Sequence, residues 1–580
     1  MLSPRLLGSL LLMHATAHAV TLHGVVRHEA EGQPLLMDSL RYRTMAGETF
    51  SITRASWLAS GFALRKSDGT WIELPGNVAW MDAAKKRTQF ALPDVPAGRY
   101  TALRFHVGLD ANTNAANPAQ YPPDHPLNPN VNGLHWSWQG GYIFLALEGS
   151  WRGADGAPGG FSYHLARDPN RTAVELAGDL DLTGDATAEI AFDLTKVLNG
   201  AKPLSFAKDG VSTHSQPKDP VAIAMVANLP AAFALSSVAS HVPEIARPSP
   251  VRPIDLPPKH TPFPFKMART FPIPPLPRDN PLLVERVELG EKLFNDTALS
   301  RDGTLSCAMC HPASNAFSDP RRFSLGVEGR VGTRQSMPLF NLAWKTSFFW
   351  DGRAPSLRAQ AMMPIQDHLE MDETLPNVVA KLQKTRAAEF ERAFGTPQVT
   401  PERIGLAVEN FVLTLTSYDS KFDRAMRGEG KLSAEEQRGF ELFMMEREPR
   451  MGSMGADCFH CHGGALFTDH QFRNNGLAID EKDLGRFKVT RSALDRGTFA
   501  TPSLRNIAVT APYMHDGRFQ TLEQVLDHYS EGVQRTGTLD PNLAKHPDGG
   551  LHLTAEEKNA VIAFLKTLTD RRFEAADQPK

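Results

Sequence analysis

Cysteine is scarce in this chain, with four residues among 580. So few thiols exclude a disulfide-rich secreted scaffold. Long apolar runs are missing as well, so no segment is predicted to span a membrane. The net charge is −3 at pH 7, which excludes the strongly basic surface typical of proteins that bind nucleic acid or anionic membranes.

All four cysteines lie in two copies of the motif Cys-x-x-Cys-His. This motif attaches c-type haem, because two thiolates add to the haem vinyl groups and the following histidine ligates the iron. Two zinc half-sites or a disulfide pair are the alternatives, but neither requires the trailing histidine that occurs twice. We therefore predict two covalently attached haems. The residues predicted to hold them are Cys307, Cys310, His311, Cys458, Cys461 and His462.

The first nineteen residues have the pattern of a secretory signal peptide. Arg5 is followed by an apolar stretch over residues 6–13 and by Ala17-His18-Ala19, which resembles a cleavage site. The apolar stretch is too short for a membrane anchor. Bacteria attach c-type haem outside the cytoplasm, so the sequence predicts a periplasmic protein with a signal peptide over residues 1–19.

Residues 20–245 are predicted to form an antiparallel β-sandwich. Runs at residues 20–26, 100–107 and 142–148 alternate or are rich in β-branched and aromatic residues, and turn formers separate them. Residues 110–133 are predicted to be a long loop. A proline-dense segment, residues 246–280, is predicted to be a linker, because proline interrupts both helices and central strands.

The remaining residues have a helical period and divide into two units, residues 281–430 and 431–580, with one haem motif each. Residues 401–426 are predicted to form one long amphipathic helix. Ser433-Ala-Glu-Glu436 and Thr554-Ala-Glu-Glu557 are predicted capping boxes that begin two further helices. The fold class is therefore multidomain, with an N-terminal sandwich followed by two all-α cytochrome c-like domains.

Residues 280–570 resemble the bacterial di-haem cytochrome c peroxidase and MauG family over nearly the full length of its two-domain unit. The stretches that carry the resemblance are residues 279–281, 299–307, 349–353, 502–506 and 510–517.

A peroxidase needs an open iron position and a neighbouring acid–base group. The resemblance implies that Gln360, Pro364 and Glu370 line the distal side of the first haem, where Glu370 takes a proton from bound peroxide. It also implies that Trp350 lies between the haems and relays electrons. Many of these enzymes carry a blocking histidine sixteen residues after the first haem histidine, but position 327 is valine here.

The second haem departs from the ordinary peroxidase pattern. A methionine usually ligates it, and the corresponding residue here is Tyr529, with His528 and Met514 as alternatives. A phenolate favours ferric and more oxidised iron, whereas a thioether favours ferrous iron. The resemblance therefore implies a MauG-like arrangement that stores two Fe(IV) equivalents.

The family also holds calcium between its haem domains. The matching positions are Gln335, Thr510 and Pro512, the last two through their carbonyl groups. Oxygen ligands suit calcium, although the family often has Asn where this chain has Gln335.

Residues 20–240 are similar to the methanobactin-associated MbnP-like family, whose members bind copper and have a tryptophan oxidised to kynurenine by an MbnH-like di-haem partner. The stretches that carry this resemblance are residues 94–100, 105–108, 126–128, 135–144 and 161–164.

The MbnP-like resemblance implies copper ligands and a modified tryptophan in the β-domain. With no cysteine there, the copper candidates are His164, His106 and His135, with His125 in reserve. The candidates for modification are Trp138 and Trp136, which share one face if they lie in a strand.

The sequence thus predicts a peroxide-dependent di-haem oxidase fused to its own β-domain substrate, since fusion raises the effective concentration of the two partners. One alternative is a cytochrome c peroxidase that detoxifies peroxide with electrons from a small cytochrome. Another is a copper-binding or copper-delivery protein in which the haems control the redox state of the metal.

Overall fold

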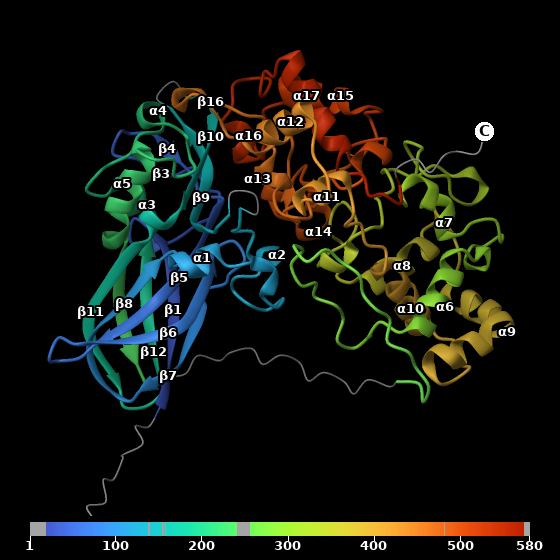
Figure 1. Ribbon diagram of the computed structural model, residues 1–580, viewed down its shortest axis with the longest axis horizontal. Helices are drawn as coiled ribbons and strands as arrows, with labels where there is room; N and C mark the ends of the chain where they lie inside the picture. The colour runs from blue at the N-terminus through green and yellow to red at the C-terminus, as the bar shows by residue number, and fades with distance from the viewer. Residues whose placement is uncertain are drawn as a thin grey trace, which may run out of the picture.

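The computed structural model describes residues 19–136, 140–153, 156, 158–240, 256–478, 480 and 482–573. A β-domain occupies one side of the molecule and the helical haem half occupies the other (Figure 1). The predicted signal peptide lies outside the described residues, apart from Ala19. No described helix is both long and apolar enough to cross a membrane.

One sheet of the β-domain is built around the first strand, whose residues alternate between the core and the surface. Val20, Leu22 and Val26 are buried, as the alternating run at residues 20–26 predicts. The strands of this sheet are β1 (Ala19–Ala30), β2 (Gln33–Pro34), β7 (Gln89–Pro96), β12 (Ala186–Asp193) and β14 (Phe233–Ala239).

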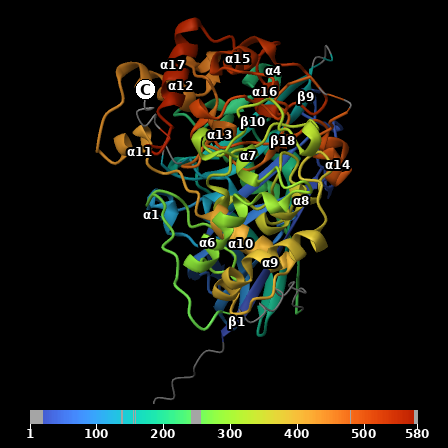
Figure 2. The ribbon, with the colours of Figure 1, turned by 90° about the vertical axis from the view of Figure 1, so that its right-hand side faces the viewer.

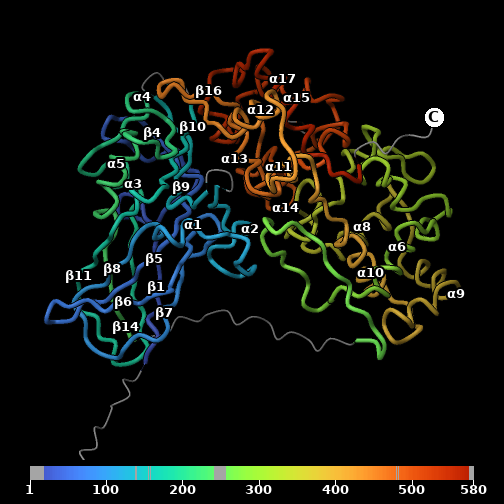
Figure 3. The backbone as a smooth tube through the Cα atoms, in the orientation of Figure 1, coloured from blue at the N-terminus to red at the C-terminus, as the bar shows by residue number. Residues whose placement is uncertain are grey.

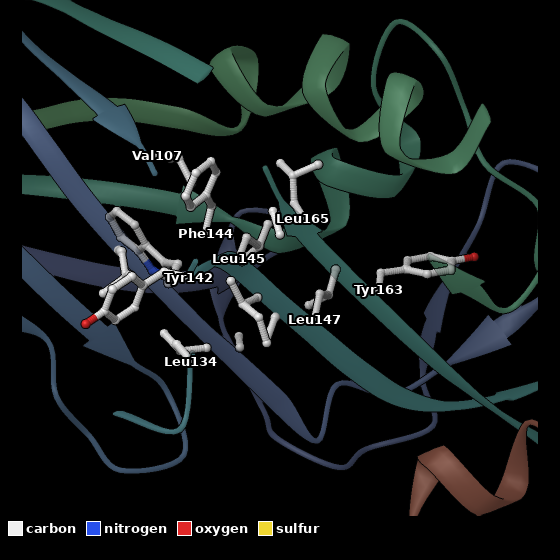
Figure 4. Packing of buried hydrophobic residues seen from close by; sticks show 14 of the residues in the cluster. Val107, Leu134, Tyr142, Phe144, Leu145, Leu147, Tyr163 and Leu165 are labelled. Atoms are coloured by element: carbon white, nitrogen blue, oxygen red, sulfur yellow. The ribbon is translucent and has the colours of Figure 1, made fainter. Parts of the chain in front are cut away.

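The second sheet provides the rest of the sandwich core. Its strands are β3 (Tyr42–Arg43), β4 (Thr49–Phe50), β5 (Arg54–Arg65), β6 (Trp71–Asp82), β8 (Gly98–Val107), β9 (Ile143–Arg152), β10 (Pro158–Ala166), β11 (Thr172–Leu182) and β13 (Ser212–Thr213). Side chains from β9 and β10, among them Phe144, Leu147 and Leu165, pack together in this core (Figure 4).

The predicted β-rich N-terminal domain and helical haem domains are confirmed. The sandwich is not uniformly antiparallel, because β1 pairs with β12 and β10 pairs with β13 in parallel. Helices α3 (Leu194–Asn199) and α5 (Pro220–Asn228) follow these strands and cover the core.

The predicted loop over residues 110–133 contains short helices, α1 (Ala111–Ala115) and α2 (Pro129–Asn132), and a turn of 3-10 helix at Pro118–Gln120. The Asn130 side chain donates a hydrogen bond to the Trp344 carbonyl oxygen at 2.9 Å. This loop therefore contacts the first haem unit.

The first haem unit is a small helical bundle in which α6 and α10 cross closely. A Cβ atom on Gly290 would lie 2.0 Å from the Ala407 carbonyl oxygen, so the crossing requires glycine. The helices are α6 (Val284–Phe294), α7 (Cys307–Cys310), α8 (Leu357–Gln366), α9 (Leu375–Phe394), α10 (Pro401–Leu413) and α11 (Lys421–Met426).

The second haem unit repeats this arrangement with α12 and α17, and both of its predicted capping boxes are confirmed at Ser433 and Thr554. Its helices are α12 (Ala434–Met444), α13 (Phe459–His462), α14 (Phe487–Thr490), α15 (Leu522–Asp527), α16 (Pro541–Ala544) and α17 (Ala555–Lys566).

A Gly439→Ala substitution is expected to lower the free energy of unfolding by about 1–3 kcal/mol, because a Cβ there would lie 1.8 Å from the Ala560 carbonyl oxygen. Chemical denaturation followed by circular dichroism measures the change. Gly537→Ala in the same unit is the matched control, since its Cβ would meet nothing within 4 Å. Equal stability of the two variants would contradict the close crossing of α12 and α17.

The prediction of one helix over residues 401–426 is wrong. The helix ends at Leu413, and α11 begins only at Lys421. Between them the backbone amides of Tyr418 and Asp419 donate to the Asp570 carboxylate at 2.8 and 3.0 Å. These contacts with the C-terminal end of the chain replace helical hydrogen bonds, which local periodicity cannot predict.

The described part of the proline-rich segment, from residue 256, runs along the haem half (Figure 3). Phe271 is fully buried, and the Trp344 indole donates to the Pro272 carbonyl oxygen at 2.6 Å. This segment is therefore part of the core of the first haem unit.

The β-domain packs directly against the second haem unit, and one hydrophobic cluster continues through both. Helix α16 lies against β10, where a Cβ on Gly160 would come within 2.2 Å of the Pro541 carbonyl oxygen. The Ser212 hydroxyl donates to Glu446 at 2.7 Å across the same junction. Viewed from the haem side, the helices lie in front of the sandwich (Figure 2).

Candidate functional site

The first haem motif lines a cavity of about 910 Å³. Helix α7 presents Cys307 and Cys310 to this cavity, and His311 follows at the end of the helix. The His311 Nδ1–H donates to the Phe317 carbonyl oxygen at 3.0 Å, which leaves Nε2 available to a metal. The thiol pair, the oriented imidazole and the cavity fit a covalently attached haem.

The predicted acid–base residues Gln360, Pro364 and Glu370 line the same cavity. Burial, and then the charge of Asp367, raise the pKa of Glu370 to about 7, while Arg353 opposes this shift. A carboxyl group with this pKa can both accept and return a proton near neutral pH.

A buried valine occupies the position where related enzymes carry a blocking histidine. Val327 is 1% exposed, and its amide donates to the Glu370 carbonyl oxygen at 2.8 Å. Among the described residues that line this cavity, His311 is the one histidine. Nothing in the described lining can therefore act as a second imidazole ligand.

Trp350 lies between the two haem sites. It lines both the first cavity and a second cavity of about 200 Å³. Its indole N–H donates to the Gln335 carbonyl oxygen at 2.8 Å, which fixes the ring in place. The structure thus places an oxidisable ring in the wall shared by both cavities.

The second haem motif lines this smaller cavity. Cys458, Cys461 and His462 belong to or adjoin α13, and the His462 Nδ1–H donates to the Phe467 carbonyl oxygen at 3.2 Å. As in the first motif, Nε2 remains free for iron. The cavity fits the second attached haem.

Two of the three residues predicted as possible ligands of the second haem iron, besides His462, reach the second cavity. Tyr529 and Met514 line it, and the Asn475 amide lies 3.4 Å from both the phenol oxygen and the thioether sulfur. His528 is turned toward the Asn475 carbonyl oxygen at 2.9 Å and is not part of the lining. Burial raises the pKa of Tyr529 to about 12, so a metal ion would have to displace the phenol proton.

The three predicted calcium ligands, Gln335, Thr510 and Pro512, all line the second cavity. The Gln335 amide nitrogen donates to the Ser318 hydroxyl at 3.0 Å. This contact engages the nitrogen and leaves the side-chain oxygen, which is the atom that calcium prefers.

The three copper candidates are not brought together. His164 lies buried in β10, whereas His106 belongs to β8 and the His135 ring packs on Tyr142 with a centroid distance of 4.6 Å. The reserve candidate, His125, stacks on Tyr121 in the long loop. The candidates of the sequence therefore lie at separate places in the β-domain, and His164, His106 and His135 remain individual predictions.

His164 instead meets two histidines that the sequence analysis missed. His214 follows β13, and His460 lies between the two cysteines of the second haem motif. The ring centroids of the three histidines lie 4.8–5.4 Å apart. The extra histidine inside the haem motif was the one sequence signal for this cluster.

Trp136 packs beside this cluster, with its ring centroid 5.5 Å from His214 and 6.3 Å from His164. It is buried and precedes β9 without belonging to a strand. Trp138 lies outside the described residues.

Comparison with known proteins gives two family matches. Residues 284–431 match the model of the di-haem cytochrome c peroxidase family, CCP_MauG, and residues 19–215 match the MbnP model.

Among curated relatives, methylamine utilization protein MauG of Methylorubrum extorquens is 38% identical over 300 residues, covering 51% of this chain and 81% of that protein. Cytochrome c551 peroxidase of Nitrosomonas europaea is 34% identical over 321 residues, covering 54% of this chain and 86% of that protein. A solved MauG-like protein associated with microbial copper homeostasis is 33% identical, covering 54% of this chain and 98% of that chain, with a TM-score of 0.48.

Proposed function

Since this chain belongs to the di-haem cytochrome c peroxidase and MauG family and carries an MbnP domain before its haem half, we propose that it oxidises a tryptophan of its own β-domain. The family consists of peroxide-dependent oxidoreductases with two haems. The finer proposal is that the protein substrate is part of the same chain.

The position of Trp136 carries this proposal. Its ring packs on His214, which in turn lies 5.4 Å from Phe459 and 4.8 Å from His460, measured between ring centroids. Phe459 and His460 are the two residues between the cysteines of the second haem motif. An oxidisable indole is therefore separated from the haem attachment loop by one imidazole ring.

The first haem site would supply the oxidising equivalents. Haem provides redox-active iron when it is bound above His311. The Glu370 carboxylate would take a proton from hydrogen peroxide and return it to the departing oxygen, and the Gln360 side chain lines the same cavity. Trp350, in the wall of both cavities, would pass electrons between the two sites.

Conversion of an indole to an N-formylkynurenine-type product removes four electrons and adds two oxygen atoms from water. Two molecules of hydrogen peroxide accept those electrons and are reduced to water. Loss of the formyl group by hydrolysis then gives kynurenine. Tyr529 would favour the oxidised iron that such a reaction needs at the second site, once iron has displaced its phenol proton.

We also propose that the mature protein is periplasmic. The predicted signal peptide over residues 1–19 would export it, and bacteria attach c-type haem outside the cytoplasm. The proposal includes two further metals. These are calcium, held by Gln335, Thr510 and Pro512, and copper in the β-domain. Of the sequence candidates for copper, His164 is retained, because its ring packs near the Trp136 ring at 6.3 Å between centroids, whereas the His135 ring packs on Tyr142.

A cytochrome c peroxidase is the second candidate, and the position of Met514 favours it. Its thioether lines the second cavity beside Tyr529 and would favour ferrous iron and electron entry from a small cytochrome. Steady peroxide turnover with reduced cytochrome c, without change in the β-domain, would support this candidate.

Peptide mass spectrometry of residues 130–150 before and after peroxide tests the main proposal. We expect oxygenated tryptophan products in the wild type, their loss at this position in Trp136→Phe, and little product in Tyr529→Phe. The haem spectrum of each variant controls for haem loading. Unmodified tryptophan throughout the β-domain of the wild type would overturn the proposal.

A further inference from the structure

We infer that Arg330 is a positioning residue for Glu370, because it holds the turn that presents the Glu370 carboxyl group to the first cavity. The inference rests on the proposed role of Glu370 and deepens it, since it names a residue that acts through this carboxylate. Glu370 is part of the cavity lining, whereas Arg330 is not. Arg330 therefore influences the site through the chain that carries Glu370.

The Glu370 carboxyl group has no partner of its own that fixes its place. Among the described residues, none forms a hydrogen bond or an ion pair with it. The backbone around it is bonded, because the Glu370 amide donates to the Asp367 carbonyl oxygen at 3.0 Å and the Glu370 carbonyl oxygen accepts from the Val327 amide at 2.8 Å. The position of the carboxyl group therefore depends on the turn formed by residues 367–372.

The Arg330 guanidinium group contacts this turn on both sides of Glu370. Its Nη1 donates to the His368 carbonyl oxygen at 3.0 Å and to the Asp372 carboxylate at 2.6 Å. The same nitrogen lies 3.1 Å from His368 Nδ1. His368 precedes Glu370 by two positions and Asp372 follows it by two positions. One charged group thus joins the two halves of the turn, and its hydrogen bonds are of the stronger, charge-assisted kind.

The segment that carries Arg330 is itself held against the turn. The Gly326 amide donates to the Arg330 carbonyl oxygen at 2.7 Å, which closes a loop around the buried Val327. A Cβ atom on Gly326 would lie 2.1 Å from the Leu369 carbonyl oxygen, so the two segments pack without a gap. Arg330 therefore holds the Glu370 turn from a fixed neighbouring segment.

These contacts belong to a small ion network that also contains Arg301 and Glu328. Arg301 lies 3.2 Å from Asp372, and Glu328 pairs with both arginines. The side chains of Arg330 and Asp372 are only 21% and 19% exposed, whereas that of Glu328 is 59% exposed. An exposed ion pair contributes little by itself, so the contact between Arg330 and Asp372 is the one that matters for the turn. If the network served stability alone, the effect of Arg330 on the peroxide reaction would not require the Glu370 carboxylate.

A double-mutant cycle tests this requirement in the full-length protein with both haems attached. Stopped-flow absorbance of the haem bands measures the rate of the reaction with hydrogen peroxide. We expect Arg330→Gln to slow the reaction about 10- to 100-fold, the size of effect that a misplacement of about 1 Å can produce. The same substitution in a Glu370→Gln background should change the rate by less than about twofold, because no carboxylate is then left to position.

Asp372→Asn is the second variant, because it removes the carboxylate partner and leaves Arg330 in place. It should slow the reaction in the wild-type background and not in the Glu370→Gln background. Glu328→Gln is the control, since it removes an exposed partner of Arg330 and leaves the contacts with the turn. It should react at the wild-type rate. Haem content and unfolding midpoints identify any variant that fails to fold.

Amide hydrogen exchange without peroxide gives a readout that does not depend on turnover. The peptide that covers residues 366–373 contains the backbone hydrogen bonds of the turn. Loss of the Arg330 contacts should let this turn open more often, so its exchange should be at least about tenfold faster in Arg330→Gln and Asp372→Asn. Exchange in Glu328→Gln should equal that of the wild type.

A wild-type rate in Arg330→Gln would overturn the inference, and so would an equal loss of rate in both backgrounds. A wild-type rate in Glu370→Gln would overturn the proposed role of Glu370 and the inference with it. Tryptophan oxidation is measured separately by mass spectrometry. A failure of the proposed oxidase activity can therefore be told apart from a failure of the positioning role.

Discussion

A Glu370→Gln variant will react with hydrogen peroxide about 100- to 10,000-fold more slowly than the wild type, because the first cavity then lacks its proton acceptor. The amide keeps the size of the side chain and cannot take the proton. Stopped-flow absorbance of the haem bands after mixing with peroxide measures the rate. A rate within a few-fold of the wild type would contradict the assigned role of Glu370.

The pH dependence of the same rate follows from the raised pKa. Burial, and then Asp367, raise the pKa of Glu370 to about 7. Below that pH the carboxyl group is protonated and cannot accept a proton, so the rate should rise as the pH increases through about 7 and then level off. Asp367→Asn removes the neighbouring negative charge and should move the midpoint to lower pH.

Glu328→Gln is the matched control for this series. Glu328 lies on the turn that contacts the Glu370 backbone, but its side chain is 59% exposed and pairs with Arg301 and Arg330. Its rate and midpoint should equal those of the wild type. If the rate of Glu370→Gln depended on pH in the same way as that of the wild type, the midpoint near pH 7 would belong to another group.

A Gly160→Val variant will lose about 100-fold of its tryptophan oxidation while it keeps its reaction with peroxide. The new Cβ would lie 2.2 Å from the Pro541 carbonyl oxygen, so α16 must move away from β10. Valine suits a strand, and the haem half is unchanged. The β-domain and the second haem unit then no longer pack together, so the raised effective concentration of Trp136 at the haem half is lost.

Peptide mass spectrometry at Trp136 and stopped-flow kinetics measure the two effects separately. Gly184→Val in the same domain is the control, since a Cβ there would meet nothing within 4 Å. Loss of both activities in Gly160→Val would indicate general damage to the fold. Full tryptophan oxidation in a correctly folded Gly160→Val would show that the interface between β10 and α16 is not needed.

Local patterns predicted most of the fold. Alternation at residues 20–26 predicts β1, and the capping boxes at Ser433 and Thr554 predict the first turns of α12 and α17. Each signal lies within a few residues of the element that it specifies. The break after Leu413 could not be predicted, because it depends on Asp570, more than a hundred residues away in the chain.

The candidate site likewise contains residues that the sequence predicts and residues that it does not. The resemblance predicted Gln360, Pro364 and Glu370 as residues of one site, and all three line the first cavity. The copper candidates of the β-domain were chosen from that domain alone. The cluster that the structure contains has one member, His460, from the other half of the chain.

The sequence by itself determined the two haem attachment sites, because each Cys-x-x-Cys-His motif is a local arrangement that needs no distant partner. Only the tertiary structure decided which surface of the β-domain meets the second motif. Packing of β10 against α16 brings His164 and His214 to His460, and Trp136 lies beside them. The identity of these residues can be read along the chain, but their proximity depends on how the β-domain and the second haem unit bury a shared contact surface.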